Sequence, residues 1–267
     1  MTAARDGIDG EGYLFDNAWQ EARRRLEVLE GHADPATRRR IEALGIRPGW
    51  RCCVPGCGAG SIARWLAERV GAGGRVLAVD LDPGLAAGSE APGLEVRRLD
   101  LTAEPLPEGD FDLVQVRLLL MHLPGREALL QKLAAALRPG GWLLVEEHEA
   151  FSAEQTEVAP YRRMFQAMVA AVRAAGGDPG WARRLPARFA ELGLADVGAE
   201  ADFPVFAGGT PAAQFWSLTA EQLRPRLVAA GLIAEGEIEA ALAVLRDPQQ
   251  WFLGPSMIAA WGRRPPG

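Results

Sequence analysis

The feature that most constrains this chain is a glycine-rich segment, Cys53–Ser61, in which glycines alternate at Gly56, Gly58 and Gly60. The segment directly follows an apolar run and directly precedes a helical pattern over 61–70. Because glycine adopts positive φ and has no Cβ, such a loop lets a ligand lie against bare backbone. The helix that follows would point its N-terminal N–H groups at that ligand. We therefore predict a ligand cradle between a strand and a helix.

Two acidic residues follow this segment at the ends of strand-like runs. The run over 76–79 ends in Asp80, and the run over 94–96 leads to Asp100. The first carboxylate is placed to accept hydrogen bonds from both ribose hydroxyls of an adenosine ligand, and the second to reach the adenine amino group. Ser61 stands where a dinucleotide fingerprint would have its third glycine. The pattern favours a nucleoside ligand, with a nicotinamide-dependent oxidoreductase as the alternative.

Strand-like runs alternate with helical patterns between residues 49 and 150, which is typical of a parallel sheet covered by helices on both faces. We therefore predict an α/β, Rossmann-like fold. The expected strands are 51–54, 75–80, 94–98, 111–117 and 142–147, and the expected helices are 61–70, 125–137 and a short one at 83–90.

Further helical patterns flank this region. They lie at 17–30, 35–44, 153–175, 179–192, 211–230 and 235–246, with strand-like stretches at 197–206 and 257–261. We expect an N-terminal helical cap over 1–48, a cofactor-binding core over 49–150, and helical lid insertions with the last two strands of the same domain over 151–267. Aromatic stripes in such helices usually belong to a core, and lining a pocket is the alternative.

Composition narrows the choice of partners. A net charge of −6 argues against a nucleic-acid partner, because phosphate binding needs a basic face. The chain has no run of about 18 apolar residues and no charged start followed by an apolar stretch, so we expect no membrane partner and a cytoplasmic location. Cys52, Cys53 and Cys57 have no second cluster to complete a metal site, so we expect small apolar filler and no metal.

Taken together, these residues resemble a class I S-adenosylmethionine-dependent methyltransferase that modifies small molecules. The markers are the glycine segment, Asp80, the Leu99-Asp100 pair, Phe111–Val114 and Leu137–Gly141, and they cover residues ~50–150. The resemblance implies a mostly parallel seven-stranded sheet whose last strand is antiparallel. It also implies S-adenosylmethionine as cofactor and methyl transfer to an O, N or C atom of a small, aromatic or polycyclic metabolite. A non-catalytic S-adenosylmethionine-binding protein is the second alternative, and a homodimer is compatible with either.

The resemblance further implies which residues hold the cofactor. Glycines of the loop would pass beneath its methionine and ribose portions, and carboxylates and leucines at the strand ends would surround its adenosine. Backbone near Arg117 would face the sulfonium, and aromatic residues of the N-terminal segment would close over the ligand. The cofactor-binding residues so implied are Gly56, Gly58, Gly60, Asp80, Leu81, Asp100, Leu101, Arg117, Tyr13 and Trp19.

One position departs from the family pattern. Members commonly carry an acidic residue two positions before the first glycine, and here that residue is Val54, followed by Pro55. The usual carboxylate helps to orient the loop or the cofactor's ammonium group. We therefore expect either weaker cofactor binding or compensation by an N-terminal residue.

Two histidines are candidates for a general base. His122 follows the fourth predicted strand, and His148 follows the fifth, beside Glu146 and Glu147. A histidine at such a strand end can titrate near neutral pH and take a proton from the methyl acceptor. The alternative is that His122 caps a helix or fills space and that His148 lies in an exposed loop.

Overall fold

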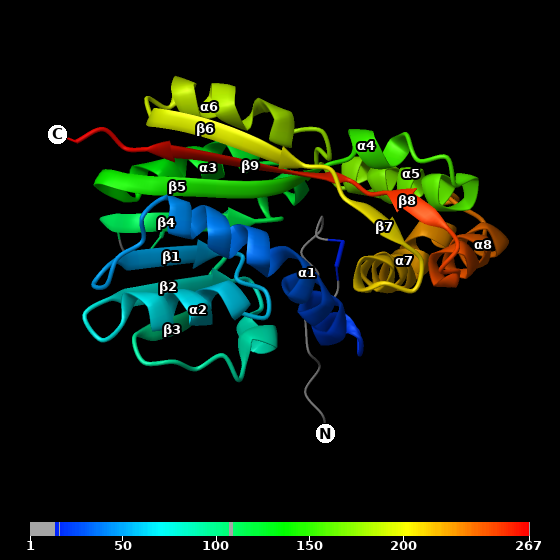
Figure 1. Ribbon diagram of the computed structural model, residues 1–267, viewed down its shortest axis with the longest axis horizontal. Coiled ribbons are helices and arrows are strands. Elements are labelled where there is room, and N and C mark those ends of the chain that lie inside the picture. Colours follow the sequence, from blue (N-terminus) through cyan, green and yellow to red (C-terminus); the bar gives the residue numbers. More distant parts are fainter. Residues whose placement is uncertain (1–13, 16, 107–108, 267) are drawn as a thin grey trace.

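A computed structural model describes residues 14–15, 17–106 and 109–266, and its centre is a seven-stranded sheet (Figure 1). In spatial order its strands are β3 (Leu94–Arg98), β2 (Arg75–Asp80), β1 (Arg51–Pro55), β4 (Phe111–Arg117), β5 (Leu137–Glu149), β9 (Ser256–Arg263) and β6 (Ala195–Asp202). The first five run parallel, whereas β9 runs antiparallel between β5 and β6. The predicted sheet, with its antiparallel last strand, is confirmed.

Side chains of the central strands alternate between two cores, because successive residues of a strand point to opposite faces. Cys52 and Val54 of β1 pack in one core, and Cys53 packs in the other. Leu113 and Val114 of β4 divide in the same way. Both faces are buried, which explains why these strands are continuously apolar in sequence.

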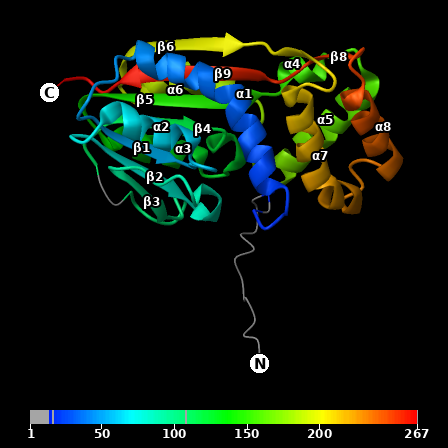
Figure 2. The ribbon, with the colours of Figure 1, turned by 60° about the horizontal axis from the view of Figure 1, so that its bottom comes forward.

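Helices cover both faces of the sheet, and the two ribbon views agree on their placement (Figures 1 and 2). On one face lie α2 (Ser61–Val70) and the C-terminal part of α1 (Ala22–Ala43). On the other lie α3 (Arg126–Ala135) and α6 (Leu185–Glu191). The sheet is therefore the middle of three layers.

A helical subassembly extends beyond the C-terminal ends of the parallel strands (Figure 2). It has a core of its own, to which the N-terminal half of α1 contributes Leu29. None of the helices among the described residues is both long and apolar enough to cross a membrane. The elements of this subassembly are α4 (Phe151–Glu154), α5 (Ala159–Ala174), α7 (Pro211–Ala229), α8 (Glu235–Arg246) and the paired strands β7 (Val205–Ala207) and β8 (Trp251–Leu253).

A buried ion pair fastens α1 to the middle of the sheet. Arg40 Nη1 lies 2.7 Å from Glu146 Oε1 of β5, and the two side chains are 3% and 0% exposed. The second oxygen of Glu146 accepts hydrogen bonds from Thr37 Oγ1 at 2.9 Å and from Gln115 Nε2 at 3.1 Å. The remaining nitrogens of Arg40 contact carboxylates of β6. Every charge in this group has a partner, as burial requires.

The N-terminal helices differ from the sequence-based prediction. The two helices expected at 17–30 and 35–44 are one helix, α1, which begins at Ala22 and continues through Pro35. Proline lacks the N–H that would bond to the carbonyl of Gly31, so local propensity argues for a break. Packing on both sides of Pro35 outweighs this local preference, because Thr37 and Arg40 are buried against the sheet while Leu29 is buried in the helical subassembly.

Prolines explain two of the other differences. The pattern at 153–175 is two helices, with Pro160 in the first turn of α5. The stretch at 197–206 is two strands, β6 and β7, because Pro204 between them has no N–H to pair. The sequence did not indicate β8, which pairs with β7. The helix expected at 83–90 is a 3-10 turn over Pro83–Ala86, and that expected at 179–192 is a short turn followed by α6.

Breaking the buried ion pair should be far more destabilising than breaking an exposed one. We expect Arg40→Met to lower the free energy of unfolding by about 3–5 kcal/mol, because Glu146 would stay buried without its counter-charge. Arg39 offers a matched control, since it pairs with Glu200 at 2.7 Å but is 58% exposed. Arg39→Met should cost less than about 1 kcal/mol. Urea unfolding of both variants measures the difference, and equal losses would contradict the assignment.

Candidate active site

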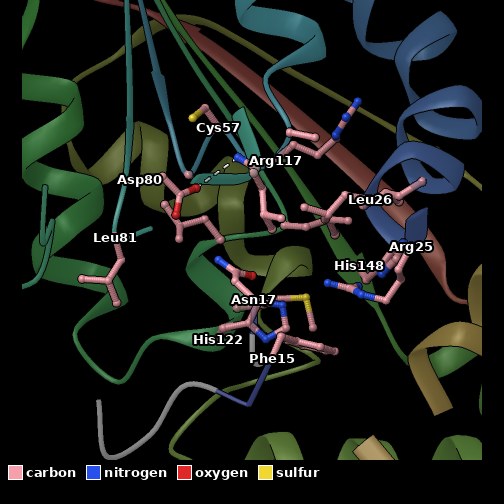
Figure 3. A pocket seen from close by; sticks show the side chains of 18 of the residues that line it. Phe15, Asn17, Arg25, Leu26, Cys57, Asp80, Leu81, Arg117, His122 and His148 are labelled. Carbon is pink, nitrogen blue, oxygen red and sulfur yellow. Dashed lines mark hydrogen bonds between the residues drawn. The ribbon is translucent and has the colours of Figure 1, made fainter. Parts of the chain in front are cut away.

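A cavity of about 540 Å³ lies where the C-terminal ends of the parallel strands meet α1, α5 and α7 (Figure 3). The strand order reverses direction between β1 and β4, and the cavity lies just outside the ends of these two strands. Open α/β sheets bind ligands at such a switch point, because the loops that leave the two neighbouring strands diverge there. The topology therefore marks this cavity as the candidate site.

The two ends of the cavity differ in character, and we name them by their residues. The glycine end comprises Gly56, Gly58, Glu30, Asp80, Leu81, Asp82, Asp100 and Leu101. The aromatic end comprises Phe15, Arg25, His122, His148, Phe165, Met168, Phe215 and Trp216.

The glycine loop has the backbone conformation that its sequence predicts. Gly56, Gly58 and Gly60 have φ angles of 67°, 56° and 87°, which residues with a Cβ rarely adopt. A Cβ added at Gly60 would lie 2.8 Å from Ser89 Oγ, and one added at Gly56 would lie 3.1 Å from the Leu119 side chain. The loop is therefore restricted to glycine by both conformation and space. It leads directly into α2.

Asp80 ends β2 beside this loop. One of its carboxylate oxygens accepts a hydrogen bond from Gly58 N at 3.0 Å, and the other accepts one from Asp82 N at 3.1 Å. Burial raises the pKa of Asp80, and these backbone hydrogen bonds oppose the rise. The carboxylate is thereby held between the glycine loop and the cavity.

The other predicted adenosine contacts lie at the same end. Asp100 Oδ1 accepts hydrogen bonds from Thr102 N at 2.9 Å and Thr102 Oγ1 at 2.6 Å, and the hydroxyl bond is the main cause of its lowered pKa. Leu81 is exposed at the rim, and Leu101 is buried. The structure thus brings together residues from the ends of two neighbouring strands.

Arg117 is the last residue of β4 and lies between the glycine end and the aromatic end of the cavity. Hydrogen bonds to α1 hold its side chain. Its Nη2 donates to Asp34 Oδ1 at 2.9 Å, and its Nη1 donates to Thr37 Oγ1 at 3.0 Å. The next residue, Leu118, has a φ of 54°, which is unfavourable for a leucine. This turn directs the chain along the cavity wall toward His122.

Glu30 is a site residue that the sequence analysis missed. It lines the cavity from α1, and its Oε1 accepts a hydrogen bond from Ser61 N at 3.2 Å at the start of α2. Val54, which replaces the family's usual carboxylate, lines the same cavity. Burial raises the pKa of Glu30. An N-terminal residue therefore supplies a carboxylate to the loop that lacks its own, although no local pattern distinguished Glu30 from the other charged residues of its helix.

Both predicted histidines line the aromatic end, but neither titrates near neutral pH. Burial, followed by the charge of Arg25, lowers the pKa of His122 to about 4. Burial, followed by the charges of His32, His122 and Arg117, lowers the pKa of His148 to about 3. The expectation of near-neutral titration is corrected, because burial disfavours the imidazolium.

Aromatic rings connect these histidines to the helical wall. His148 lies 5.6 Å from Trp216, which itself lies 5.5 Å from Phe165, as measured between ring centroids. His122 meets the edge of Phe15 at 5.5 Å. The wall at this end is thus apolar, with two neutral imidazoles set into it.

The N-terminal segment contributes different residues from those predicted. Tyr13 lies outside the described residues. Trp19 does not line the cavity, whereas Phe15 and Asn17 from the same segment do. The three cysteines are buried, and burial raises the pKa of the Cys57 thiol to about 12, in agreement with a packing role.

Comparisons with known proteins agree with this geometry. Residues 54–145 match a family model described as a methyltransferase domain. Methyltransferase str2 of Strobilurus tenacellus is 31% identical over 186 residues, which are 67% of this chain and 65% of that protein. Nocamycin O-methyltransferase of Saccharothrix syringae is 32% identical over 114 residues, 40% of this chain and 41% of that protein. The chain thus spans less than two thirds of the length of these relatives.

Solved structures share the fold at low sequence identity. An N-methyltransferase of Haemonchus contortus, bound to phosphomonomethylethanolamine and S-adenosylhomocysteine, has a TM-score of 0.55 at 16% identity and covers 96% of this chain and 55% of its own. The YcgJ protein of Bacillus subtilis has a TM-score of 0.55 at 16% identity, covering 85% of this chain and 97% of its own.

The lowered histidine pKa values predict that these two residues contribute less to stability in acid. In the unfolded chain each histidine binds a proton near pH ~6.5, whereas in the folded chain His122 and His148 do so near 4 and 3. At these two positions the unfolded state therefore binds more protons below pH ~6.5, and the histidine contribution to stability falls as the pH is lowered through this window. We expect the NMR signals of both imidazoles to stay unchanged from pH ~7.5 to ~5, and His148→Gln to flatten the fall in stability. Titration of either signal near 6.5 would contradict the prediction.

Proposed function

Because this chain belongs to the class I S-adenosylmethionine-dependent methyltransferases, we propose that it methylates an O, N or C atom of a small, aromatic or polycyclic metabolite. The observation that carries this proposal is the junction, in one cavity, of the glycine end and the aromatic end. The relationship to nocamycin O-methyltransferase supports a role in secondary metabolism. The similarity to this family argues against the alternative, a nicotinamide-dependent oxidoreductase. Such an enzyme would have the third glycine of its fingerprint at the position of Ser61.

Two features of the glycine end suit S-adenosylmethionine. The loop presents bare backbone at Gly56 and Gly60, where an added Cβ would lie too close to Leu119 or Ser89. The end also carries four carboxylates, Glu30, Asp80, Asp82 and Asp100. They outnumber its one guanidinium, that of Arg98, whose Nε donates to Leu81 O at 3.1 Å, so this end favours a cofactor that bears positive charge. Asp80 would accept hydrogen bonds from the ribose hydroxyls, and Asp100 would accept one from the adenine amino group. Leu81 and Leu101 would pack on the adenine ring.

Glu30 would bind the ammonium group of the cofactor in place of the carboxylate that Val54 lacks. Its carboxylate lies at the start of α2 and lines the cavity. It stands in a polar chain that runs from Ser61 through Asp34 to Arg117, with Ser61 Oγ donating to Asp34 Oδ1 at 3.1 Å. This chain holds α1 against the loop and fixes the position of Glu30.

The aromatic end would align the methyl acceptor. The bound cofactor supplies a methyl group that its sulfonium already activates, so the remaining tasks are to orient the acceptor and to exclude water. Phe165, Met168 and Phe215 offer an apolar wall to a flat ring system. His148 is neutral, so its imidazole would accept a hydrogen bond from an acceptor O–H or N–H and orient that group. His122 lines the same end, next to Phe15.

The direct test of this proposal is a screen for methyl transfer. We expect at least one member of a panel of aromatic and polycyclic metabolites to gain the mass of one methyl group, only when S-adenosylmethionine is present, as measured by mass spectrometry. Asp80→Asn should weaken binding of S-adenosylhomocysteine by about 10-fold to 100-fold, because it removes a charged hydrogen-bond acceptor. Glu95→Gln, an exposed change on the neighbouring strand, is the control. Tight cofactor binding without any methylated product would instead favour a non-catalytic binding protein.

The role of Glu30 predicts a loss of affinity limited to ligands with an amino-acid portion. Glu30→Gln should weaken S-adenosylhomocysteine by about 10-fold but leave methylthioadenosine, which lacks the ammonium group, unchanged. Calorimetry with both ligands makes the comparison, and Glu27→Gln on the exposed side of α1 is the matched control. Equal losses for both ligands, or no loss for either, would show that Glu30 does not contact the ammonium group.

A further inference from the structure

The turn that follows β4 forms one wall of the cavity and begins in a conformation that leucine disfavours. Leu118 has a φ of 54°, and its N–H donates to Glu146 O at 2.9 Å. Every residue of the segment 118–123 except Leu120 lines the cavity. A strained backbone of this kind persists only where its surroundings hold it. The groups that hold this turn therefore help to shape the site.

Glu147 of β5 holds the turn. Its Oε1 accepts hydrogen bonds from Leu119 N at 3.0 Å and from Leu120 N at 2.7 Å. Glu147 is 0% exposed and does not itself line the cavity. Because successive residues of a strand point to opposite faces, it lies on the face of the sheet opposite to Glu146, which binds α1. Two neighbouring carboxyl groups of β5 thus fasten two different walls of the cavity.

The second oxygen of Glu147 is buried without a hydrogen-bond partner among the residues that the structure describes. Burial raises the pKa of Glu147 to about 8, although its backbone hydrogen bonds oppose the rise. Burying a carboxyl group with one oxygen unused is costly, and an apolar side chain at this position would avoid that cost. The hydrogen bonds to the turn are what the carboxyl group provides and an apolar side chain would not.

The turn reaches both ends of the cavity. The Leu119 side chain lies 3.1 Å from where a Cβ on Gly56 would be, so it packs against the glycine loop. Three residues later, His122 lines the aromatic end beside Phe15 (Figure 3). A displacement of the turn would therefore move a contact of the glycine loop and a wall residue of the aromatic end together.

We propose that Glu147 is a positioning residue of this site, which acts through the turn and touches neither the cofactor nor the acceptor. Its Oε1 holds the strained turn so that Leu119 stays against the glycine loop, where the cofactor would bind, while His122 faces the acceptor. The inference rests on the proposed function, because it assigns a further residue to that same site.

The test compares the affinities of variants for S-adenosylhomocysteine, measured by calorimetry at a temperature at which circular dichroism shows each variant to be folded. Glu147→Leu should weaken binding by about 10-fold, because two N–H groups lose their acceptor and the turn is released. Glu147→Gln keeps a side-chain oxygen that can accept both hydrogen bonds, so its affinity should stay within about 2-fold of the wild type.

Glu149→Leu is the matched control. Glu149 is a buried carboxylate of the same strand, but its partners, Arg183 and Phe151 N, belong to residues that do not line the cavity. This variant should lower the melting temperature and leave the affinity for S-adenosylhomocysteine unchanged. A merely structural role for Glu147 would give the same result in Glu147→Leu.

The NMR signals of the His122 imidazole give a second readout that needs no ligand. They should shift in Glu147→Leu and keep their positions in Glu147→Gln. If Glu147→Leu does not fold, Glu147→Asp replaces it with the same expected losses, because the shorter side chain withdraws the oxygen from the turn.

Wild-type affinity in the variant that releases the turn would overturn the inference. An equal loss in Glu147→Gln or in Glu149→Leu would also overturn it, because the loss would then not depend on an acceptor oxygen at the turn. Failure of the wild type to bind S-adenosylhomocysteine would instead overturn the proposed function, and this inference with it.

Discussion

The long helix α1 lies where it does because Arg40 and Glu146 form a buried ion pair against the middle of the sheet. Such a pair adds little net stability relative to apolar packing, but a displaced partner leaves an uncompensated charge in the interior. Thr37 and Gln115 satisfy the other oxygen of Glu146. A shift of α1 by one residue would break both contacts that the helix makes with Glu146, those of Arg40 and Thr37. The interaction therefore acts mainly by fixing position, and the cavity depends on that position.

From this anchor α1 carries chemically different residues to different parts of the cavity. At 1.5 Å per residue, Glu30 lies about 15 Å and Arg25 about 22 Å along the helix from Arg40. The first reaches the glycine loop, and the second reaches the aromatic rings of α7. One helix thus contributes a carboxylate where the cofactor's positive charge is expected and a guanidinium where the acceptor is expected. Pro35 does not divide it, because both halves are packed.

The parts of the fold that follow local rules were predictable from sequence. Gly56–Gly60, Asp80 and Asp100 lie together because parallel strands end at the same edge of a sheet, and their residue types suit a nucleoside. Glu30 and Arg25 could not be found in this way, since their partners Ser61 and Phe215 are distant in the chain and their helix looks like an ordinary charged surface helix. The lowered pKa values of the two histidines could not be predicted from the sequence either, because they result from burial in the packed fold.

We infer that one cavity holds the cofactor at its glycine end and leaves its aromatic end for the acceptor. The decisive experiment is to determine the crystal structure of the chain with S-adenosylhomocysteine. We expect density for adenosine between Asp80 and Asp100, the homocysteine ammonium group within hydrogen-bond distance of Glu30, and the space beside Trp216 open. Density for the ligand among the aromatic rings, or an ammonium group directed away from Glu30, would contradict it.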